Sequence, residues 1–342
     1  MLFFLVNKRH YKSCMYTYMT YNVNARSLCP SSSNQMVLSS NQKVIANGAI
    51  VYITSEPAMP GLKAEFCNSS KISSSNSLSW NISYKPLSMG SMATSCIPNS
   101  YNTSLAGTYV DITSIVTNSY YILCGLNAIR GGTYTVSVTA SGSTQSLTFN
   151  VLGKNPDASA VQSYIAIYEA IAYGLVWYAM PVAYYETVGS FAQFTSSGYP
   201  VMKNNNGFYG FGIYPVATNE TEVYCQQIWN WKSNIVNGVA WLVNLRNGSI
   251  ESKARGWMDA QRALAKQQNN NVSVPVPTVT DSDCVFQDGT SRTIENAVAL
   301  KIFNGADNGN YCFWDTNAKA WKINKLNSDN IDYVGRVCDF VK

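Results

Sequence analysis

Hydrophobic and polar residues alternate with a period of two along much of the first half of the chain. The apolar positions of one such run are Leu78, Trp80, Ile82 and Tyr84. Those of a second run are Tyr134, Val136, Val138 and Ala140. Because successive side chains of a strand point to opposite faces, both runs predict strands of a sheet with one buried face. The second run reaches a turn at Ser141-Gly142-Ser143 and resumes over 147–151, which predicts a β-hairpin.

Other β-branched and aromatic segments occur at 49–54 and 108–116, with turn-forming residues between them. Residues 40 to 153 are therefore predicted to form a series of short strands, and their apolar positions show no helical period. Regular spacing of this kind is typical of an immunoglobulin-like sandwich. We expect an N-terminal tail over residues 1–27 and an all-β immunoglobulin-like domain over residues 28–153.

The pattern changes at Asn155-Pro156-Asp157. Proline at a helix start, with Asp157 or Ser159 as the cap, predicts a long apolar helical stretch that continues toward Glu186. Helical stripes then follow, with apolar positions at Ile228, Trp231, Ile235, Val239 and Leu242, at Ala254, Trp257, Met258 and Leu264, and at Ile331, Val334, Val337 and Val341. Residues 154–342 are therefore predicted to form a mainly helical domain. An Asn-rich and Pro-containing stretch marks an exposed insertion near 267–290.

Charge and histidine content exclude several functions. The chain has 342 residues, a formal net charge of +5 and only 13% charged residues, so it lacks the basic clusters of a nucleic-acid-binding protein. Its single histidine, His10, lies in the N-terminal tail, which excludes Ser/His and Cys/His nucleophiles and most zinc hydrolases. The uncharged run at 170–185 is too short for a membrane span and contains Gly174 and Pro181, so a buried core helix is predicted.

Nine cysteines are dispersed along the chain, and no two have C-x-x-C spacing. This favours structural disulfides over metal or redox motifs, with buried thiols as the alternative. Four cysteines lie between residues 29 and 124 and four between 225 and 338, so each half can close two bridges, leaving Cys14. The acids near residue 283 lack the pattern of a calcium loop, so neither a metal nor a cofactor is predicted. The start, MLFFLVNKRHYK, has no clear signal peptide.

Glu186 is the acid that ends the uncharged run. A carboxyl held against apolar side chains loses hydration of its charged form, so we expect it to stay protonated near neutral pH and to donate a proton. The following segments, 196–215 and 227–235, are rich in aromatic and Asn residues, which suit the faces and polar groups of sugars. The alternative is an ordinary helix-terminal acid at a solvated end.

Several short motifs occur in a consistent order. They are Glu186-Thr187, Gly212-Ile213-Tyr214-Pro215, Asn234-Ile235 with Gly238, Phe303-Asn304-Gly305, and Tyr333-Val334 with Val337. In this order the chain resembles lytic transglycosylases of the lysozyme-like superfamily. The GKNP at 153–156, the QF at 193–194 and the WNWK at 229–232 are similar to a phage and bacterial subgroup whose catalytic part follows an immunoglobulin-like module.

The resemblance implies a C-terminal lysozyme-like domain that cleaves the β-1,4 bond between N-acetylmuramic acid and N-acetylglucosamine in peptidoglycan. Glu186 would first act as general acid and then as base on the muramyl 6-hydroxyl, so no second enzyme carboxylate is required. The implied substrate-binding residues are Thr187, Tyr214, Asn234, Phe303 and Asn304. The implied partner is the peptidoglycan glycan strand, and the protein would act as a monomer that is secreted, periplasmic, in the cell envelope or delivered by a phage.

The chain departs from the family pattern at three positions. Thr187 replaces a serine and keeps its hydroxyl, Pro215 replaces a glutamine and loses its amide, and Phe303 replaces a tyrosine and loses its phenolic hydroxyl. These departures leave two alternatives open. One is a glycan-binding or structural protein without turnover on the same fold, and the other is a hydrolytic lysozyme that uses water.

Overall fold

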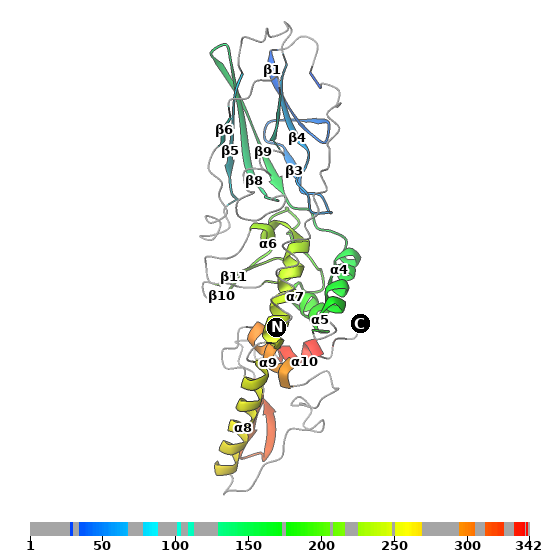
Figure 1. Ribbon diagram of the computed structural model, residues 1–342, viewed down its shortest axis with the longest axis vertical. Coiled ribbons are helices and arrows are strands. Elements are labelled where there is room, and N and C mark those ends of the chain that lie inside the picture. The colour runs from blue at the N-terminus through cyan, green and yellow to red at the C-terminus, as the bar shows by residue number, and fades with distance from the viewer. Residues whose placement is uncertain are drawn as a thin grey trace.

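The structure is a computed structural model in which two β-sheets occupy one end of an elongated molecule and the helices, with two short hairpins, occupy the rest (Figure 1). The residues that it describes are 28–29, 34–67, 78–87, 101–103, 109–112, 129–172, 176–205, 208–215, 225–247, 250–268, 294–304, 312–324, 332–338 and 340. The fold of this part of the chain combines β-sheets with α-helices.

The first half contains two sheets. One has the strand order β3 (Ile50–Tyr52), β9 (Ser143–Leu152), β8 (Gly132–Ala140), β5 (Ser79–Lys85) and β6 (Tyr101–Thr103). The other has the order β2 (Lys43–Ile45), β1 (Gln35–Ser40), β4 (Leu62–Cys67) and β7 (Tyr109–Asp111). Neighbouring strands are antiparallel except β3 and β9, which are parallel.

The two sheets enclose one core of buried side chains. The alternating apolar positions that the sequence predicted to face inward are buried, including Trp80, Ile82 and Val136, except that Ala140 at the end of β8 is half-buried. The ring of Tyr134 stacks on Phe149 with centroids 5.5 Å apart. The predicted hairpin is confirmed, since β8 pairs with β9 and residues 141 and 142 form its two-residue turn.

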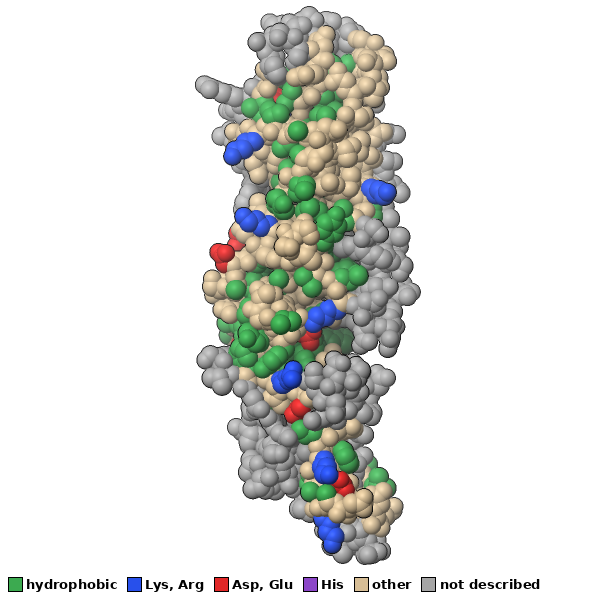
Figure 2. Space-filling model, turned by 180° about the vertical axis from the view of Figure 1, so that it is seen from behind, with side chains coloured by type: hydrophobic (Ala, Val, Ile, Leu, Met, Phe, Trp, Pro, Cys, Tyr) green, Lys and Arg blue, Asp and Glu red, His purple; other side chains and the backbone are tan. Residues whose placement is uncertain are grey.

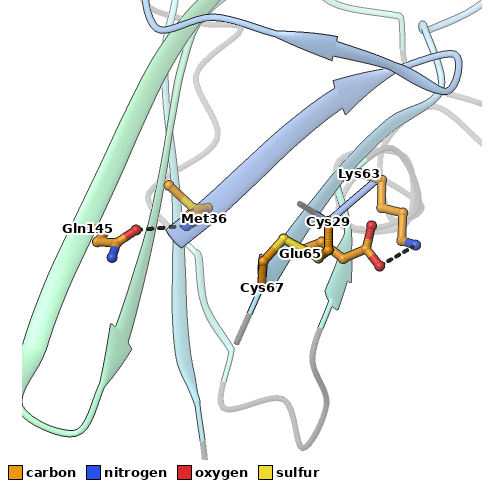
Figure 3. Close-up of a disulfide and its surroundings, with 6 residues drawn as sticks. All are labelled: Cys29, Met36, Lys63, Glu65, Cys67 and Gln145. Carbon is orange, nitrogen blue, oxygen red and sulfur yellow. Dashed lines mark hydrogen bonds and ion pairs between the residues drawn. A yellow bond between two sulfur atoms is a disulfide. The ribbon is translucent and has the colours of Figure 1, made fainter. Parts of the chain in front are cut away.

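Two links near β1 are visible in Figure 3. The side-chain oxygen of Gln145, on β9, accepts a hydrogen bond of 2.7 Å from the Met36 N–H, on β1, and so joins the two sheets. Cys29 forms a disulfide with Cys67 at the end of β4. This bridge lies within the first half, as the cysteine distribution predicted. Cys312 is disulfide-bonded too, whereas Cys14, Cys96, Cys124 and Cys284 lie outside the described residues.

The second half is mainly helical. Its helices are α4 (Ala158–Ile171), α5 (Ala179–Glu186), α6 (Cys225–Trp229), α7 (Trp231–Asn247), α8 (Ile250–Gln268), α9 (Ile294–Phe303) and α10 (Tyr333–Cys338). Two hairpins interrupt them, β10 (Met202–Asn205) with β11 (Phe208–Phe211) and β12 (Cys312–Asp315) with β13 (Ala320–Ile323). α4, α5, α7, α9 and α10 bury a second hydrophobic core, which includes Ile165, Val182, Leu242, Leu300 and Val337.

The single helical stretch expected before Glu186 is divided into two helices. α4 ends at Ile171 and α5 begins at Ala179. Pro181 lies in the first turn of α5, where a missing N–H breaks no helical hydrogen bond. Asp157 occupies the cap position of α4, but its side chain makes no capping hydrogen bond. α8 continues to Gln268, past the expected start of the insertion, and residues 269–293 lie outside the described part.

On the face shown in Figure 2, the Lys and Arg side chains of the described residues are scattered along the molecule and form no large patch. Among the helices that the structure describes, none combines the length and the apolar character needed to cross a membrane.

Candidate functional site

The site is built around the short helix α5, which ends at Glu186. One face of α5 is buried in the helical core, and both of its ends are fixed. At its start, the Met180 N–H donates a hydrogen bond of 2.8 Å to the buried carboxylate of Glu169, on α4. At its end, the Thr187 hydroxyl donates to the Ala183 carbonyl at 2.7 Å and accepts from the N–H of Phe191 at 2.9 Å. Glu186 therefore extends from a helix that cannot easily rotate or slide.

The carboxylate of Glu186 has two polar partners from distant parts of the chain. The Tyr333 hydroxyl, at the start of α10, donates a hydrogen bond of 2.8 Å to Oε1. The Lys203 ammonium, on β10, lies 2.5 Å from Oε2. The Glu186 side chain is 11% exposed, whereas that of Lys203 is 44% exposed. The Glu186 side chain is thus largely buried, but its carboxyl contacts two polar groups, whereas the sequence predicted that it is held against apolar side chains.

Tyr333 remains a hydrogen-bond donor because its phenol resists ionisation. Burial raises the pKa of Tyr333 well above its ordinary value, and the negative charge of Glu186 raises it further. The helix that carries Tyr333 is capped by Asp332, whose carboxylate accepts a hydrogen bond of 2.8 Å from the Gly335 N–H. This cap fixes the first turn of α10 and therefore the position of the phenol.

A turn at 212–215 packs beside α5, and Asn234 from α7 holds it in place. The Asn234 side-chain oxygen accepts a hydrogen bond of 2.8 Å from the Tyr214 N–H. Its amide nitrogen donates to the carbonyls of Phe211 and Tyr214, at 2.7 and 3.2 Å. The Tyr214 hydroxyl donates to the Ala179 carbonyl, the first residue of α5, at 2.7 Å. Tyr214 and Asn234 are both buried. Their polar groups bond within the protein, so the structure uses both to position α5.

Gln193 is a second buried amide at this turn, with no exposed surface. Its oxygen accepts a hydrogen bond of 3.2 Å from the Ile213 N–H, and its nitrogen donates to the carbonyls of Gln227 and Ile228 at 3.0 and 2.9 Å. A Cβ on Gly212 would lie 2.1 Å from the Gln193 amide, so only glycine fits there. Three separate segments are joined through this one side chain.

The chain between Glu186 and Lys203 follows a tight path. Val188 and Phe191 have positive φ angles of 52° and 51°, a conformation that costs free energy for residues with a Cβ. The Val201 N–H then donates to the Gln193 carbonyl, and the Gly212 N–H donates to the Val201 carbonyl, both at 2.9 Å. These bonds align β10 so that Lys203 reaches the carboxylate.

The remaining predicted substrate-binding residues lie at the end of α9. Phe303 is its last residue and packs against the helical core. The Asn304 N–H donates to the Leu300 carbonyl at 3.0 Å, which extends the last turn of the helix. The structure thus joins Glu186, Thr187, Tyr214 and Asn234 through a connected set of contacts around α5. Phe303 and Asn304 lie on a different element of the same core.

Lys203 is the contact that sequence reasoning missed. It is a single lysine in a polar run, and no local pattern links it to an acid 17 residues earlier. Tyr333 and Gln193 lie within sequence motifs, but the motifs did not indicate what their side chains contact. Over the described ranges, no cluster of three or more His, Cys, Asp or Glu side chains is arranged to hold a metal ion.

Comparison with known proteins gives no relative for this chain. No family model matches it, and neither a curated protein nor a solved structure does.

Proposed function

We propose that this chain is a peptidoglycan-cleaving lytic transglycosylase, with an immunoglobulin-like sandwich followed by a lysozyme-like domain. The observation that carries the proposal is the placement of Glu186. Its side chain is 11% exposed and extends from the end of an apolar helix, and its carboxyl is oriented by the Tyr333 hydroxyl at 2.8 Å. A carboxyl fixed in this way and partly open to solvent suits proton transfer to and from a sugar.

The reaction needs one enzyme carboxylate because the substrate supplies the nucleophile. A protonated Glu186 gives its proton to the glycosidic oxygen as the bond from that oxygen to the muramyl C1 breaks. The resulting carboxylate then takes the proton of the muramyl 6-hydroxyl while the oxygen of that hydroxyl bonds to C1. The products are a free 4-hydroxyl on N-acetylglucosamine and a 1,6-anhydro ring, and Glu186 is protonated again. Hydrolases with two carboxylates use water or an enzyme nucleophile at this point.

The surrounding residues supply position in this scheme. Thr187, Tyr214 and Asn234 fix the two ends of α5 and the neighbouring turn, so they set the direction of the Glu186 side chain. Such positioning contributes to catalysis because a small displacement of the acid from the leaving oxygen slows proton transfer. The substrate-binding role of Phe303 and Asn304 remains part of the proposal.

The site of action in this proposal is outside the cytoplasm: secreted, periplasmic, in the cell envelope or delivered by a phage. The Cys29–Cys67 disulfide supports an oxidising compartment. The partner is the glycan strand of peptidoglycan, and the protein acts as a monomer.

A second candidate is a protein that binds glycan without cleaving it. The observation that favours it is the ion pair of Glu186 with Lys203, since an ammonium 2.5 Å from Oε2 occupies an oxygen that a glycosidic oxygen would have to approach. Pro215 also favours this candidate, because it lacks the side-chain amide of the glutamine that it replaces in the family pattern. A hydrolytic lysozyme differs from the leading proposal only in its product.

The test is digestion of purified peptidoglycan, followed by mass analysis of the products. We expect the wild-type protein to release 1,6-anhydromuropeptides and Glu186→Gln to reduce the rate by about a thousandfold, because general acid–base groups contribute about 10²–10⁴. Glu56→Gln is the matched control, since it alters an exposed ion-paired glutamate at Lys232. Reducing sugar ends would instead identify a hydrolase. Binding without any product would reject an enzyme.

A further inference from the structure

The C-terminal end of α5 is a Schellman motif with a valine at the position where glycine is usual. The Gly189 N–H donates to the Tyr184 carbonyl at 2.7 Å, and the Val188 N–H donates to the Tyr185 carbonyl at 3.3 Å. This pair of bonds requires Val188 to adopt a left-handed backbone conformation, and its φ angle is 52°. Glycine is the residue most often found there because it has no Cβ. A β-branched side chain is strongly disfavoured in this conformation.

Packing does not offset this cost at Val188, because its side chain is 93% exposed. Phe191 has nearly the same φ angle, 51°, but it is buried in the helical core. The other described residues that combine a Cβ with a positive φ lie in hairpin turns and are not β-branched: Asn41, Gln42, Ser141 and Lys319. Within the described part of the chain, Val188 therefore stands alone as an exposed β-branched side chain on a strained backbone.

Val188 lies close to the proposed acid. It follows Glu186 by two positions, and two residues of extended chain span at most about 7 Å. The Tyr184 ring is 38% exposed and lies against Gly189, where a Cβ would be 3.0 Å from the ring. The same ring packs against Phe191, with centroids 6.0 Å apart. The end of α5 thus presents two apolar side chains, Val188 and Tyr184, to solvent near the acid.

We propose that Val188 is a substrate-contact residue, whose side chain packs on an N-acetylated sugar of the glycan strand bound at Glu186, beside the Tyr184 ring. This inference rests on the proposed function, since the short distance to Glu186 is what brings a sugar to Val188. Burial of apolar surface between Val188 and the C–H groups of the sugar releases free energy only on binding. A side chain that is unfavourable for folding is then favourable for binding, and strained residues of this kind cluster at ligand sites.

Val188→Gly tests the proposal, because its effects on folding and on binding have opposite signs. Glycine adopts this φ angle without strain, so we expect the melting temperature to rise by about 2–4 °C. Loss of the apolar side chain should raise KM for peptidoglycan by about tenfold. It should leave kcat nearly unchanged, because the contact is the same in the bound substrate and in the transition state. A purely structural role would not weaken binding while stability increases.

Two variants serve as controls. Val188→Ile keeps an apolar β-branched side chain and should keep the wild-type KM. Ser141→Gly relieves a comparable φ angle of 49° in the turn between β8 and β9. It should also raise the melting temperature and leave KM unchanged, because that turn lies in the β-rich half of the chain. A wild-type KM in Val188→Gly would overturn the inference.

Binding without turnover separates this inference from the proposed function. Cosedimentation with insoluble peptidoglycan compares Glu186→Gln with the double variant that also carries Val188→Gly. We expect the dissociation constant of the double variant to be about tenfold larger. Equal constants would reject the contact even if the wild type cleaves peptidoglycan. Unequal constants without cleavage by the wild type would support the contact and reject the enzyme, and no binding by either variant would reject both.

Sedimentation velocity tests the other occupant of this surface, a second copy of the chain. We expect the wild type and Val188→Gly to sediment alike as monomers. A wild-type dimer that Val188→Gly dissociates would assign the exposed valine to a contact between copies, and the proposed sugar contact would be wrong.

Discussion

Two buried amide side chains, those of Asn234 and Gln193, determine the shape of the site. Gln193 bonds to backbone groups of two segments that are distant in sequence, and Asn234 bonds to three backbone groups of the 211–214 segment. A buried backbone group that loses its partner costs about 1–3 kcal/mol, so an amide that serves several groups contributes more than one ordinary hydrogen bond. These residues explain why the turn at 212–215 keeps its position beside α5.

Asn234→Ala tests this role. It removes the partners of the Tyr214 N–H and of two carbonyls, so we expect the free energy of unfolding to fall by about 3 kcal/mol. Chemical denaturation measures the change.

The control lies one turn along the same helix. Asn237 is exposed, and its amide donates to the Ser233 carbonyl at 2.8 Å. Asn237→Ala should change the free energy of unfolding by less than about 0.5 kcal/mol, as surface substitutions usually do. Equal losses for the two variants would show that Asn234 has no special part in holding the turn.

At the scale of elements, the hairpin of β8 and β9 shows how local sequence determines local structure. Its two turn residues, Ser141 and Gly142, have φ angles of 49° and 80°. Positive φ at both central residues is the geometry of a type I′ turn, which matches the right-handed twist of the flanking strands. The two longest strands of the larger sheet, β8 and β9, are therefore joined by a turn whose backbone conformation favours glycine.

Gly142→Ala isolates the backbone cost of this turn, because a Cβ there would meet no atom within 4 Å. We expect a loss of about 1 kcal/mol in the free energy of unfolding, since only the left-handed conformation is penalised. Thermal and denaturant unfolding measure it. Ser141→Asn is the companion variant and should stabilise the hairpin, because asparagine is preferred at the first position of this turn. A neutral Gly142→Ala would contradict the turn geometry.

The sequence predicts elements well where a pattern is both local and long. The alternation in β5 and β8 identified their buried faces, and the uncharged run identified the helix that ends at Glu186. The β12–β13 hairpin was missed because each of its strands has only four residues, too few to establish a period. The break between α4 and α5 was missed because the apolar character continues across it.

The candidate site was predictable only in part, for a related reason. Glu186 could be recognised from its neighbours along the chain, whereas Lys203 and Tyr333 reach it from 17 and 147 residues away. Contacts at such separations depend on how whole elements pack, which one sequence does not encode in any short window. The pairing of Cys29 with Cys67 could not be predicted either, because many pairings of nine cysteines are compatible with their spacing.

At the scale of the whole molecule, the strands and the helices share a buried contact. Phe194, Phe211, Ile228 and Trp229 belong to the same hydrophobic cluster as the side chains between the two sheets. The Trp231 indole N–H also donates to the Ser55 carbonyl at 2.7 Å. Asn155 adds bonds to residues 193 and 194 from the segment that follows β9.

Gly131→Ala tests this contact, since a Cβ there would lie 2.1 Å from the Trp229 ring. Overpacking of a rigid core costs about 1–3 kcal/mol, so we expect a lower melting temperature and a shifted tryptophan emission. Gly256→Ala is the control, because its Cβ would meet no atom within 4 Å on the exposed side of α8. It should be neutral or stabilising by up to about 1 kcal/mol. An unchanged emission in Gly131→Ala would argue against a packed contact.

The close fit of Phe194 against Gly153 has a consequence for engineering. A Cβ at Gly153 would lie 2.2 Å from the phenyl ring, and Phe194 belongs to the loop that connects α5 to β10. Grafting the β-rich half onto a different helical domain would therefore require transplanting that loop with it. Chimaeras joined near residue 154 should be designed with the donor's 191–201 segment, because a simple fusion would leave Gly153 and the adjoining core without the Phe194 ring that covers them.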